Sequence, residues 1–403
     1  MIVCKFGGSS VSHYDAVCKV KEILLSNKQR KIAVISAMGK SPNSNIKLTD
    51  ILIALSQETK SCNFERLYLQ FYLRCKDYSE KFKINANEII DFEKLKLDIK
   101  NGLSKNFIVS LGEFFTAKVC AIFFNWLFCP IEKIIISENG KINLNKSKEN
   151  FLSFYNGNNI VVPGFYVGNK RGEIVLLERG GSDTTGAILS NITNANLYEK
   201  FTDVNGLYPY NFDNLNIDQI VTSLSYGQLT SISSNGFQPF SKKAIKFLSQ
   251  KNINCEIKKC ELNSNLKTVL GKKSNQYFFK NSNLYYIFKQ VKKVKKYHFI
   301  SSIFKTFMFD KIKIDDAVFC NKKLYVKASN PFNNNKVIVV TELFLFGNKY
   351  CKLKKQICNY LKKSKLDFHI TDLSLYGDKI IIKIFGITKS DIQKNLINIL
   401  EKR

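Results

Sequence analysis

The 403-residue sequence contains few prolines, histidines and tryptophans, with six, three and one of each. Its 11 cysteines form no Cys-x-x-Cys pair, and the three histidines, His13, His298 and His369, lie far apart. Zinc sites normally need such pairs or nearby histidines, so we expect no protein-held metal. Free thiols are typical of a reducing compartment.

Long uninterrupted apolar segments are also missing. The longest run, around Val119 to Ile131, contains Asn125 and is shorter than the roughly 20 residues that a membrane-spanning helix needs. The chain opens on a strand-like segment, MIVCKF, and not on a basic region followed by an apolar core. We therefore expect a cytoplasmic protein without a membrane partner.

Acidic residues are scarce relative to basic ones, 33 against 62, which gives a formal net charge of +29. Only six of the basic residues are arginines, and the lysines are scattered along most of the chain. The densest basic run, Lys289 to Lys296, interleaves apolar residues as a solvated helix or strand face does. This distribution favours a dispersed lysine surface, and no nucleic-acid partner is expected.

The composition, with 45% hydrophobic and 24% charged residues, predicts a globular protein of two or three domains. In the first two thirds, short β-branched runs alternate with helical patterns, which is typical of a mostly parallel sheet covered by helices. After Gly271 the glycine pairs stop and Lys, Phe and Tyr become more frequent. The predicted domains are therefore residues 1–271 and 272–403.

The patterns predict the following elements. Expected strands are Ile2–Phe6, Ile32–Ser36, Lys133–Ile136, Asn159–Val162 and Glu199–Thr202. Expected helices are Val11–Leu25, Leu48–Gln57, Glu113–Leu127, Thr184–Leu189 and an amphipathic Cys351–Ser364, with a polar helical segment at Ser61–Lys100. Gly168–Gly172 is expected to be a hairpin turn, and Leu373–Phe385 to be two strands.

One strand-to-helix junction is glycine-rich, Lys5-Phe6-Gly7-Gly8-Ser9-Ser10. Adjacent glycines let backbone N–H groups approach an anion, and the following helix adds its positive end. Lys5 would neutralise a phosphate there. An ordinary glycine turn is the alternative. The segment ending in Gly39-Lys40-Ser41 is not a P-loop, because Val34 occupies the position of the first glycine.

A second such junction reads Glu178-Arg179-Gly180-Gly181-Ser182-Asp183-Thr184-Thr185. Arg179 offers a planar fork for a carboxylate, and Asp183 beside an anion site would handle a proton or a metal. Alternatively, Ser182 or Asp183 merely caps the next helix. Capping leaves the Arg-Gly-Gly sequence unexplained.

Together with four further motifs, these junctions resemble the aspartokinases of the amino-acid kinase superfamily. The motifs, in the family's order, are KFGGSSV (Lys5–Val11), SAMGK (Ser36–Lys40), an SxGE-type element (Ser110–Glu113), PGF (Pro163–Phe165), RGGSDTT (Arg179–Thr185) and TDVNGLY (Thr202–Tyr208). The resemblance implies an α/β fold, with a carbamate kinase-like three-layer sandwich over residues 1–271. The remainder resembles a degenerate pair of α+β, ferredoxin-like ACT-type modules.

The resemblance also implies a reaction, the transfer of the γ-phosphoryl group of ATP to the β-carboxylate of L-aspartate, with Mg²⁺ bridging the phosphates. The product, 4-phospho-L-aspartate, would lead to lysine, threonine, methionine and diaminopimelate. The implied catalytic residues are Lys5 and Asp183, and the implied aspartate-binding residues are Ser36, Glu113, Arg179 and Ser182. The implied nucleotide-binding residues are Lys5, Gly7, Gly8, Ser9, Thr202, Asp203, Tyr208 and Gln238.

The sequence departs from the family pattern at three places, mainly in segments that the resemblance assigns to nucleotide binding. Pro42 stands where threonine is usual, and the chain continues after TDVNGLY with Pro209 where the family commonly continues toward Asp-Pro-Arg. Gln238 stands where a nucleotide-contacting lysine is expected, and Lys242 or Lys243 would be a substitute. These changes predict weakened ATP binding rather than a loss of aspartate recognition. The alternative function is a catalytically weakened aspartokinase-like protein with a binding or regulatory role.

The C-terminal region has room for two ACT-like units of roughly 60–70 residues. In the family, such modules bind lysine or threonine at a subunit interface. The resemblance therefore implies a homodimer formed through this region, with lysine or threonine as effector. A region that only dimerises is the alternative.

Overall fold

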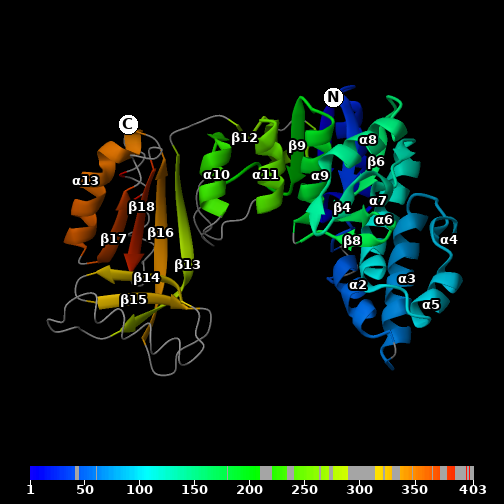
Figure 1. Ribbon diagram of the computed structural model, residues 1–403, viewed down its shortest axis with the longest axis horizontal. Coiled ribbons are helices and arrows are strands. Elements are labelled where there is room, and N and C mark those ends of the chain that lie inside the picture. Colours follow the sequence, from blue (N-terminus) through cyan, green and yellow to red (C-terminus); the bar gives the residue numbers. More distant parts are fainter. Residues whose placement is uncertain are drawn as a thin grey trace. The chain divides into compact units, whose positions relative to one another are not determined.

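The computed structural model describes residues 1–40, 45–59, 61–178, 180–208, 220–233, 240–262, 265–271, 276–288, 314–320, 323–328, 336–346, 348–364, 366–372, 379–385, 396 and 399. These residues form two compact units (Figure 1). The first contains Met1–Leu207, Ile220–Ser233 and Gln238–Lys272, and the described residues from Gln276 onward belong to the second.

An eight-stranded sheet forms the centre of the first unit, in the order β10-β12-β11-β9-β1-β2-β6-β3. The strands are β1 (Ile2–Phe6), β2 (Arg30–Ile35), β3 (Leu127–Phe128), β6 (Ile160–Pro163), β9 (Leu197–Thr202), β10 (Ser223–Leu224), β11 (Asn254–Lys259) and β12 (Lys267–Leu270). All neighbours are parallel except the β11–β12 pair. Parallel sheets are normally covered on both faces, and the central strands here are almost fully buried.

Six α-helices contribute to the hydrophobic core of this unit. They are α1 (Tyr14–Leu25), α2 (Leu48–Gln57), α3 (Phe64–Glu80), α4 (Ala86–Ile89), α5 (Phe92–Lys100) and α6 (Lys105–Phe124), and α1 follows a 3₁₀ turn, η1 (Gly8–Val11). Helix α6 is long and apolar enough to cross a membrane, but 72% of its apolar window is buried inside the fold. It is therefore a core helix, which packs on β2, β6 and α2.

Helix α9 (Gly181–Ile192) contacts β1, β2 and β9, and α11 (Lys242–Gln250) packs on it. Every residue of α9 is buried. The remaining helices of this unit are α7 (Ile131–Ile134), α8 (Leu144–Phe154) and α10 (Tyr226–Ser233). A small sheet, in the order β5-β4-β7-β8, is formed by β4 (Ile136–Glu138), β5 (Lys141–Ile142), β7 (Tyr166–Asn169) and β8 (Ile174–Leu176).

Most predicted elements of the first unit are confirmed. The strand Ile2–Phe6 and the helix Leu48–Gln57 have the predicted bounds, and the Gly168–Gly172 turn joins β7 to β8. The prediction of a strand at Lys133–Ile136 is wrong, because α7 ends at Ile134 and β4 begins only at Ile136. A short apolar run of this kind does not distinguish a helix from a strand.

Two predicted helices begin too late. Helix α6 starts at Lys105 and not at Glu113, because the Ser104 hydroxyl accepts a hydrogen bond from the Phe107 amide and caps it. Helix α9 starts at Gly181 and not at Thr184.

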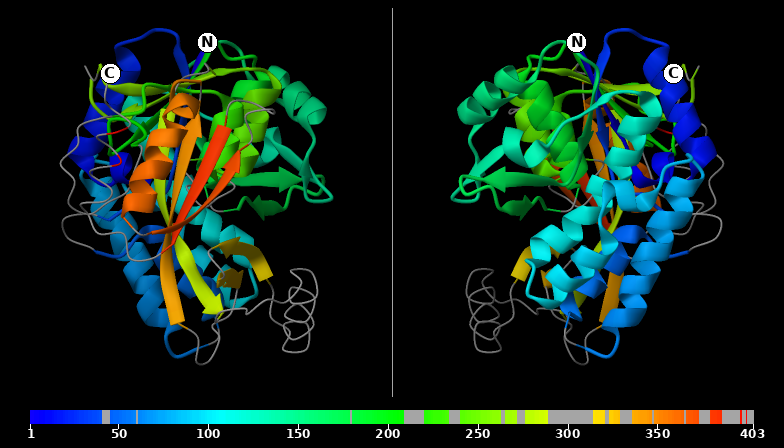
Figure 2. Two further views of the ribbon diagram at one scale, coloured as in Figure 1. Left: turned by 90° about the vertical axis from the view of Figure 1, so that its left-hand side faces the viewer. Right: turned by 90° about the vertical axis from the view of Figure 1, so that its right-hand side faces the viewer.

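The second unit contains an antiparallel six-stranded sheet, in the order β14-β15-β13-β16-β18-β17. The strands are β13 (Gln276–Phe288), β14 (Ile314–Cys320), β15 (Lys323–Ala328), β16 (Lys336–Phe346), β17 (Asp367–Asp372) and β18 (Lys379–Phe385). Helix α13 (Asn348–Lys363) contacts β16 and β17 (Figure 2). This confirms the amphipathic helix, whose Ile357 and Leu361 are buried. The run Lys289–Lys296 lies outside the described residues.

Candidate active site

Two lysines and one aspartate meet where β1, β9 and α9 come together. Lys5 and Lys200 are direct partners across the parallel β1–β9 pair, so their side chains leave the same face of the sheet. Lys5 Nζ lies 2.9 Å from Asp183 Oδ1, and Lys200 Nζ lies 2.7 Å from Asp183 Oδ2. Asp183 is only 6% exposed, and the two lysine side chains are 12% and 13% exposed. A single buried carboxylate therefore holds two ammonium groups.

The electrostatics of this cluster favour an anionic ligand. Burial by itself would raise the pKa of Asp183, but the ammonium groups of Lys200 and Lys5 outweigh it and lower that pKa. Burial lowers the pKa of Lys200, and the charge of Lys5 adds to this shift, whereas Asp183 opposes it. With Asp183 ionised, the three groups carry one positive charge in excess when both lysines are protonated.

The glycines around Lys5, in the turn after β1 and in the SAMGK segment, differ in what surrounds them. A Cβ added to Gly8 would lie 2.8 Å from the Ala37 carbonyl oxygen, and one added to Gly39 would lie 2.9 Å from the Gly8 backbone. The Gly39 amide donates a hydrogen bond to the Gly8 carbonyl at 2.9 Å. At Gly7 an added Cβ would meet only Lys5 Nζ among the described residues, at 3.8 Å. Gly8 and Gly39 are thus required by packing, whereas Gly7 keeps the space beside the ammonium group free.

The PGF and RGGSDTT motifs are in direct contact at the start of α9. A Cβ on Gly164 would lie 2.6 Å from the side chain of Ser182, and one on Gly181 would lie 2.8 Å from the ring of Phe165. The helix cap is Gly180, whose φ of 81° is left-handed, and no side chain caps this end. The alternative interpretation of Ser182 or Asp183 as a helix cap is therefore wrong.

Glu113 is a second buried carboxyl group, on α6 and beside the SAMGK segment. It is 4% exposed, and its Oε2 atom has no hydrogen-bond partner among the described residues. Burial raises its pKa to about 8, although a hydrogen bond from the Ala37 backbone opposes the shift. Ala37 also lies against α6, where a Cβ on Gly112 would be 3.1 Å from the Ala37 Cβ. A buried carboxyl group with an unused oxygen suits a cationic or hydrogen-bond-donating ligand.

The structure places the other predicted site residues as follows. The Ser36 amide donates to the Phe6 carbonyl at 3.2 Å, at the end of β1. Thr202 ends β9, and its hydroxyl donates to Asp203 Oδ1 at 2.9 Å. Ser9 lies in η1 and Tyr208 is half-buried. Arg179, Gln238, Pro42 and Pro209 lie outside the described residues.

Lys200 is the site residue that was missed from sequence. A lysine on a strand with two buried faces is unusual and is a usable signal, because lysine is rarely buried without a specific partner. Which partner it meets depends on the β1–β9 register and on α9, and neither is visible in the strand's own sequence.

Glu199, the residue before Lys200, lies on the opposite face of β9 and forms a separate ion-pair network. Arg30 donates to it from Nε at 2.6 Å and from Nη2 at 3.0 Å. Lys258 also donates to Glu199 and, at 3.1 Å, to Glu256. The Glu199 side chain is only 3% exposed. This network links β2, β9 and β11 and is structural.

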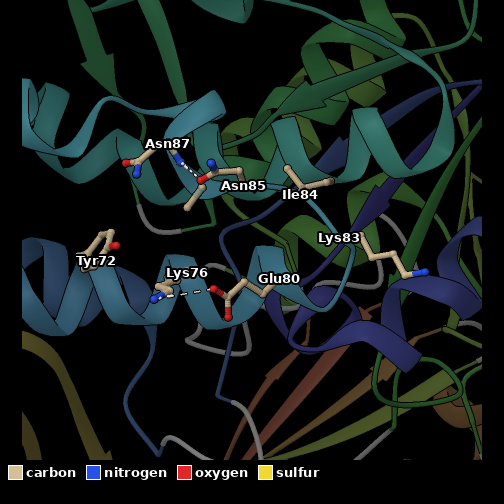
Figure 3. Close-up of a pocket in the computed structure, with 8 residues that line it drawn as sticks. Tyr72, Lys76, Glu80, Lys83, Ile84, Asn85 and Asn87 are labelled. Atoms are coloured by element: carbon tan, nitrogen blue, oxygen red, sulfur yellow. Dashed lines mark hydrogen bonds and ion pairs between the residues drawn. The ribbon is translucent and has the colours of Figure 1, made fainter.

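Two surface hollows lie on the helical layer and contain none of the predicted site residues. One, of about 370 Å³, is lined by residues of α3 and of the segment that follows it, among them Tyr72, Lys83 and Asn85 (Figure 3). Lys76 and Glu80 form an ion pair of 3.8 Å along its edge. The other, of about 540 Å³, is lined by α3 and α5.

The described residues include no group of three or more His, Cys, Asp or Glu side chains that could hold a metal ion. The carboxylate of Asp183 is already held by two lysines. This donor set fits Mg²⁺ carried mainly by the oxygens of a bound nucleotide, which is a common mode of magnesium binding.

Comparison with known proteins is consistent with this geometry. Aspartokinase 3 of Bacillus subtilis is 28% identical over 268 residues, which cover 61% of this chain and 58% of that protein. The bifunctional aspartokinase/homoserine dehydrogenase of Buchnera aphidicola is 26% identical over 284 residues, 64% of this chain and 35% of the relative. The chain thus matches little more than half of the first relative's length and about a third of the second's.

Two solved structures are similar to this chain in fold. Aspartate kinase of Clostridium acetobutylicum superposes with a TM-score of 0.81 at 22% identity, covering 100% of both chains. E. coli aspartokinase III in complex with lysine and aspartate gives a TM-score of 0.76 at 16% identity, again covering 100% of both chains. The predicted amino acid kinase α/β fold is confirmed by these likenesses.

The family assignment follows from the longest match. The model of the amino acid kinase family matches residues 1–259, which is more than half of the chain and includes all six motifs. Homology to aspartokinases, seen in several curated relatives, agrees with it. The chain therefore belongs to the amino acid kinase family.

Proposed function

We propose that the protein is an aspartate kinase, which transfers the γ-phosphoryl group of ATP to the β-carboxylate of L-aspartate. The observation that carries this proposal is the buried Asp183 carboxylate held by Lys5 and Lys200 beside an open glycine turn. The relatives support the choice of substrate, since a solved E. coli neighbour of the same fold is described as a complex with aspartate and ADP. The reaction would supply the first step toward lysine, threonine and methionine.

The site's residues suit phosphoryl transfer between two anions. Such a reaction needs charge neutralisation and in-line positioning rather than a strong base. Lys5 would contact the γ-phosphoryl group, while Gly7, Gly8 and Ser9 would donate hydrogen bonds to the phosphates. Asp183 would keep the lysines oriented. The attacking β-carboxylate is already ionised near neutral pH, so no protein group has to remove a proton. Bound Mg²⁺ would neutralise phosphate charge.

Aspartate recognition is assigned to the residues around α6 and the start of α9. Glu113 would accept hydrogen bonds from the α-ammonium group, since its unpartnered Oε2 is buried beside the SAMGK segment. Arg179, which precedes the Gly180 cap, would bind the α-carboxylate. Ser36 and Ser182 would add hydroxyl contacts.

The nucleotide base and ribose are assigned to Thr202, Asp203 and Tyr208. The departure at Gln238 predicts a lower affinity for ATP than an additional lysine would give. A catalytically weakened protein with a binding or regulatory role is the second candidate, and it is favoured by the run of changes from Pro209 to Lys242.

The second unit is proposed to hold two ACT-like modules that form a homodimer and bind lysine or threonine. Its antiparallel sheet and α13 supply the strands and a helix that such modules use. Domain bounds of 1–271 and 272–403, and a cytoplasmic location, belong to the same proposal.

The proposal is tested by ADP release from the full-length protein with Mg-ATP, with and without L-aspartate, in the presence of hydroxylamine to trap the acyl phosphate. We expect ADP release to depend on L-aspartate and to be matched by hydroxamate. Binding of aspartate without any hydroxamate would contradict the kinase and support the second candidate.

The raised pKa of Glu113 predicts that aspartate binding releases protons. With a pKa of about 8, the free carboxyl group is mostly protonated at pH 7, and it must ionise to pair with an ammonium group. As pH rises toward 8, the dissociation constant for aspartate should therefore fall about tenfold per pH unit. Above pH 8 it should level off. Titration calorimetry at pH 7, in two buffers that differ in ionisation enthalpy, should show release of close to one proton.

Glu113→Gln should abolish this proton release. The matched control is Glu132→Gln, because Glu132 on α7 also has a buried, unpartnered Oε2 and a pKa raised by burial but lies outside the site. Proton release that persists in Glu113→Gln, or is lost in Glu132→Gln, would rule out Glu113 as the ammonium ligand.

Two glycine substitutions should separate packing from ligand binding. Gly39→Ala places a methyl group 2.9 Å from the Gly8 backbone and should lower stability by about 1–3 kcal/mol. Gly7→Ala meets only ordinary contact, 3.8 Å from Lys5 Nζ, and should leave the melting temperature unchanged. It should still lower kcat/KM for ATP by about tenfold or more, because the methyl group enters the space assigned to phosphate. If Gly7→Ala keeps the wild-type kcat/KM for ATP, the phosphates do not bind beside Gly7.

A further inference from the structure

We propose that Lys200 is a second catalytic cation, which contacts the phosphoryl group during transfer together with Lys5. The inference rests on the proposed kinase function. It also assigns Lys200 the task that the aspartokinase resemblance gives to a lysine at position 238, where this chain has Gln238.

The backbone register delivers Lys200 to the same place as Lys5. The two residues are Cα partners in neighbouring parallel strands, so their side chains leave the sheet side by side. Both ammonium groups then reach one carboxylate, that of Asp183, at 2.9 and 2.7 Å. An anion bound to Lys5 at this end of the sheet is therefore within the reach of Lys200.

The cations on the two faces of β9 differ in their exposure to solvent. On the structural face, three cations, Arg30, Lys258 and Lys267, meet the carboxylates of Glu199 and Glu256. The side chain of Lys267 is 40% exposed, so water solvates part of this charge. On the site face, Lys5 and Lys200 both pair with the Asp183 carboxylate, and their side chains are only 12% and 13% exposed. Positive charge that is shielded from water attracts an anion more strongly than solvated charge does, because the surrounding dielectric constant is lower. A transferred phosphoryl group would be such an anion, within reach of both ammonium groups.

Glu113 adds little negative charge to this face near neutral pH. Its carboxyl group is buried nearby on α6, but a pKa of about 8 leaves it mostly protonated near neutral pH. The other groups that influence Lys200 on this face include the Cys255 thiol, whose pKa is raised by burial, so it is neutral.

Lys200 is also held in place before any ligand arrives. Its ammonium group lies 4.3 Å from the ring centroid of Phe240, which is buried and in turn packs on Tyr198. A cation–π contact in a desolvated place helps to fix the side chain. By contrast, Lys242 and Lys243 are exposed at the start of α11, and Lys243 pairs with Glu178 at 2.8 Å. They are poorer substitutes for the expected lysine.

In the proposed step, an oxygen of the aspartate β-carboxylate forms a bond to the γ-phosphorus of ATP. The bond from that phosphorus to the bridging oxygen breaks, and its electron pair leaves with ADP. No proton is transferred, and Lys200 would stabilise the negative charge on the moving group.

The test compares Lys200→Met with Lys200→Arg and with a matched control, Lys258→Met. Lys258 is equally buried, and its ammonium group also binds a carboxylate of β9, but on the structural face. Lys200→Met should lower kcat for aspartate-dependent hydroxamate formation by about 10²–10³-fold, with the KM for aspartate nearly unchanged. Lys200→Arg should keep part of the activity. Lys258→Met should lower the melting temperature and leave kcat unchanged.

A rescue experiment tests whether Lys200 acts on the phosphoryl group or only holds Asp183 in place. If Lys200 performs the task expected of a lysine at position 238, adding Gln238→Lys to Lys200→Met should raise kcat at least tenfold. A kcat of folded Lys200→Met within threefold of wild type would overturn the inference, as would a failure of Gln238→Lys to restore any activity.

The inference remains testable if the kinase proposal fails. A wild-type protein that forms no hydroxamate contradicts the kinase but not a phosphate contact by Lys200. In that case, calorimetry with Mg-ATP and Mg-ADP decides. Lys200→Met should weaken the binding of Mg-ATP about tenfold and that of Mg-ADP little, whereas equal affinities of the variant and wild type would overturn the inference.

Discussion

Asp183→Asn is expected to lower kcat for aspartate-dependent phosphoryl transfer by about 10³-fold or more. Asparagine has the shape of aspartate but no charge, and its amide nitrogen cannot accept a hydrogen bond. The ammonium groups of Lys5 and Lys200, now 2.9 and 2.7 Å from the carboxylate oxygens, would repel one another and lose their common anchor. Losses of this size are typical when a residue that orients a reacting group is removed. Hydroxamate formation under saturating substrates measures the effect.

The matched control is Asp91→Ala. Asp91 also stands at the start of a helix, where its side chain accepts a hydrogen bond from the Lys94 amide at 3.0 Å and caps α5. Its removal should cost about 1 kcal/mol of stability and leave kcat unchanged. If folded Asp183→Asn keeps kcat within tenfold of wild type, Asp183 does not organise the transfer.

Glu199→Gln is expected to lower the free energy of unfolding by about 3–5 kcal/mol. The substitution leaves Arg30 and Lys258 buried without the carboxylate that both now bind. Such a loss corresponds to a fall in melting temperature on the order of 10 °C for a unit of this size. Thermal unfolding followed by circular dichroism measures it.

The stability that Glu199 supplies should depend on pH. Burial by itself would raise its pKa, but the Arg30 and Lys258 contacts lower it below the ordinary value of 4.5. The unfolded chain therefore binds more protons than the folded one in the acid range, and the contribution is complete above pH 4.5 and lost as pH falls further. The difference in the free energy of unfolding between wild type and Glu199→Gln should therefore become smaller as the pH falls below 4.5.

Glu65→Gln is the control for this prediction. Glu65 also pairs with two lysines, Lys96 and Lys100, but its side chain is 57% exposed. Exposed ion pairs contribute little, so the melting temperature should not change measurably. A similar loss in both variants would mean that burial is not the cause.

The sequence was sufficient to predict the elements that carry the two glycine junctions. The alternation and glycine pairs around Lys5 and Asp183 are local features, and local features determine β1 and the beginning of α9 to within a few residues. They also indicated that glycines are needed, which the Gly8–Gly39 and Gly164–Ser182 contacts explain.

The contacts made by site residues could not be predicted in the same way. That Lys200 meets Asp183 depends on the β1–β9 register, which pairs residues 195 positions apart. The protonation of Glu113 depends on its burial under other segments. The short run at Lys133–Ile136 was misassigned because its place beside β7 is decided by tertiary packing.

The most direct test of the account is the chemical identity of the product. Wild-type protein would be incubated with Mg-ATP, L-aspartate and hydroxylamine, and the hydroxamate analysed by mass spectrometry with the isomeric α- and β-hydroxamates as standards. The account predicts the β-hydroxamate of aspartate, formed in step with ADP and lost in Asp183→Asn. An equal yield from Asp183→Asn, or ADP release without β-hydroxamate, would contradict it.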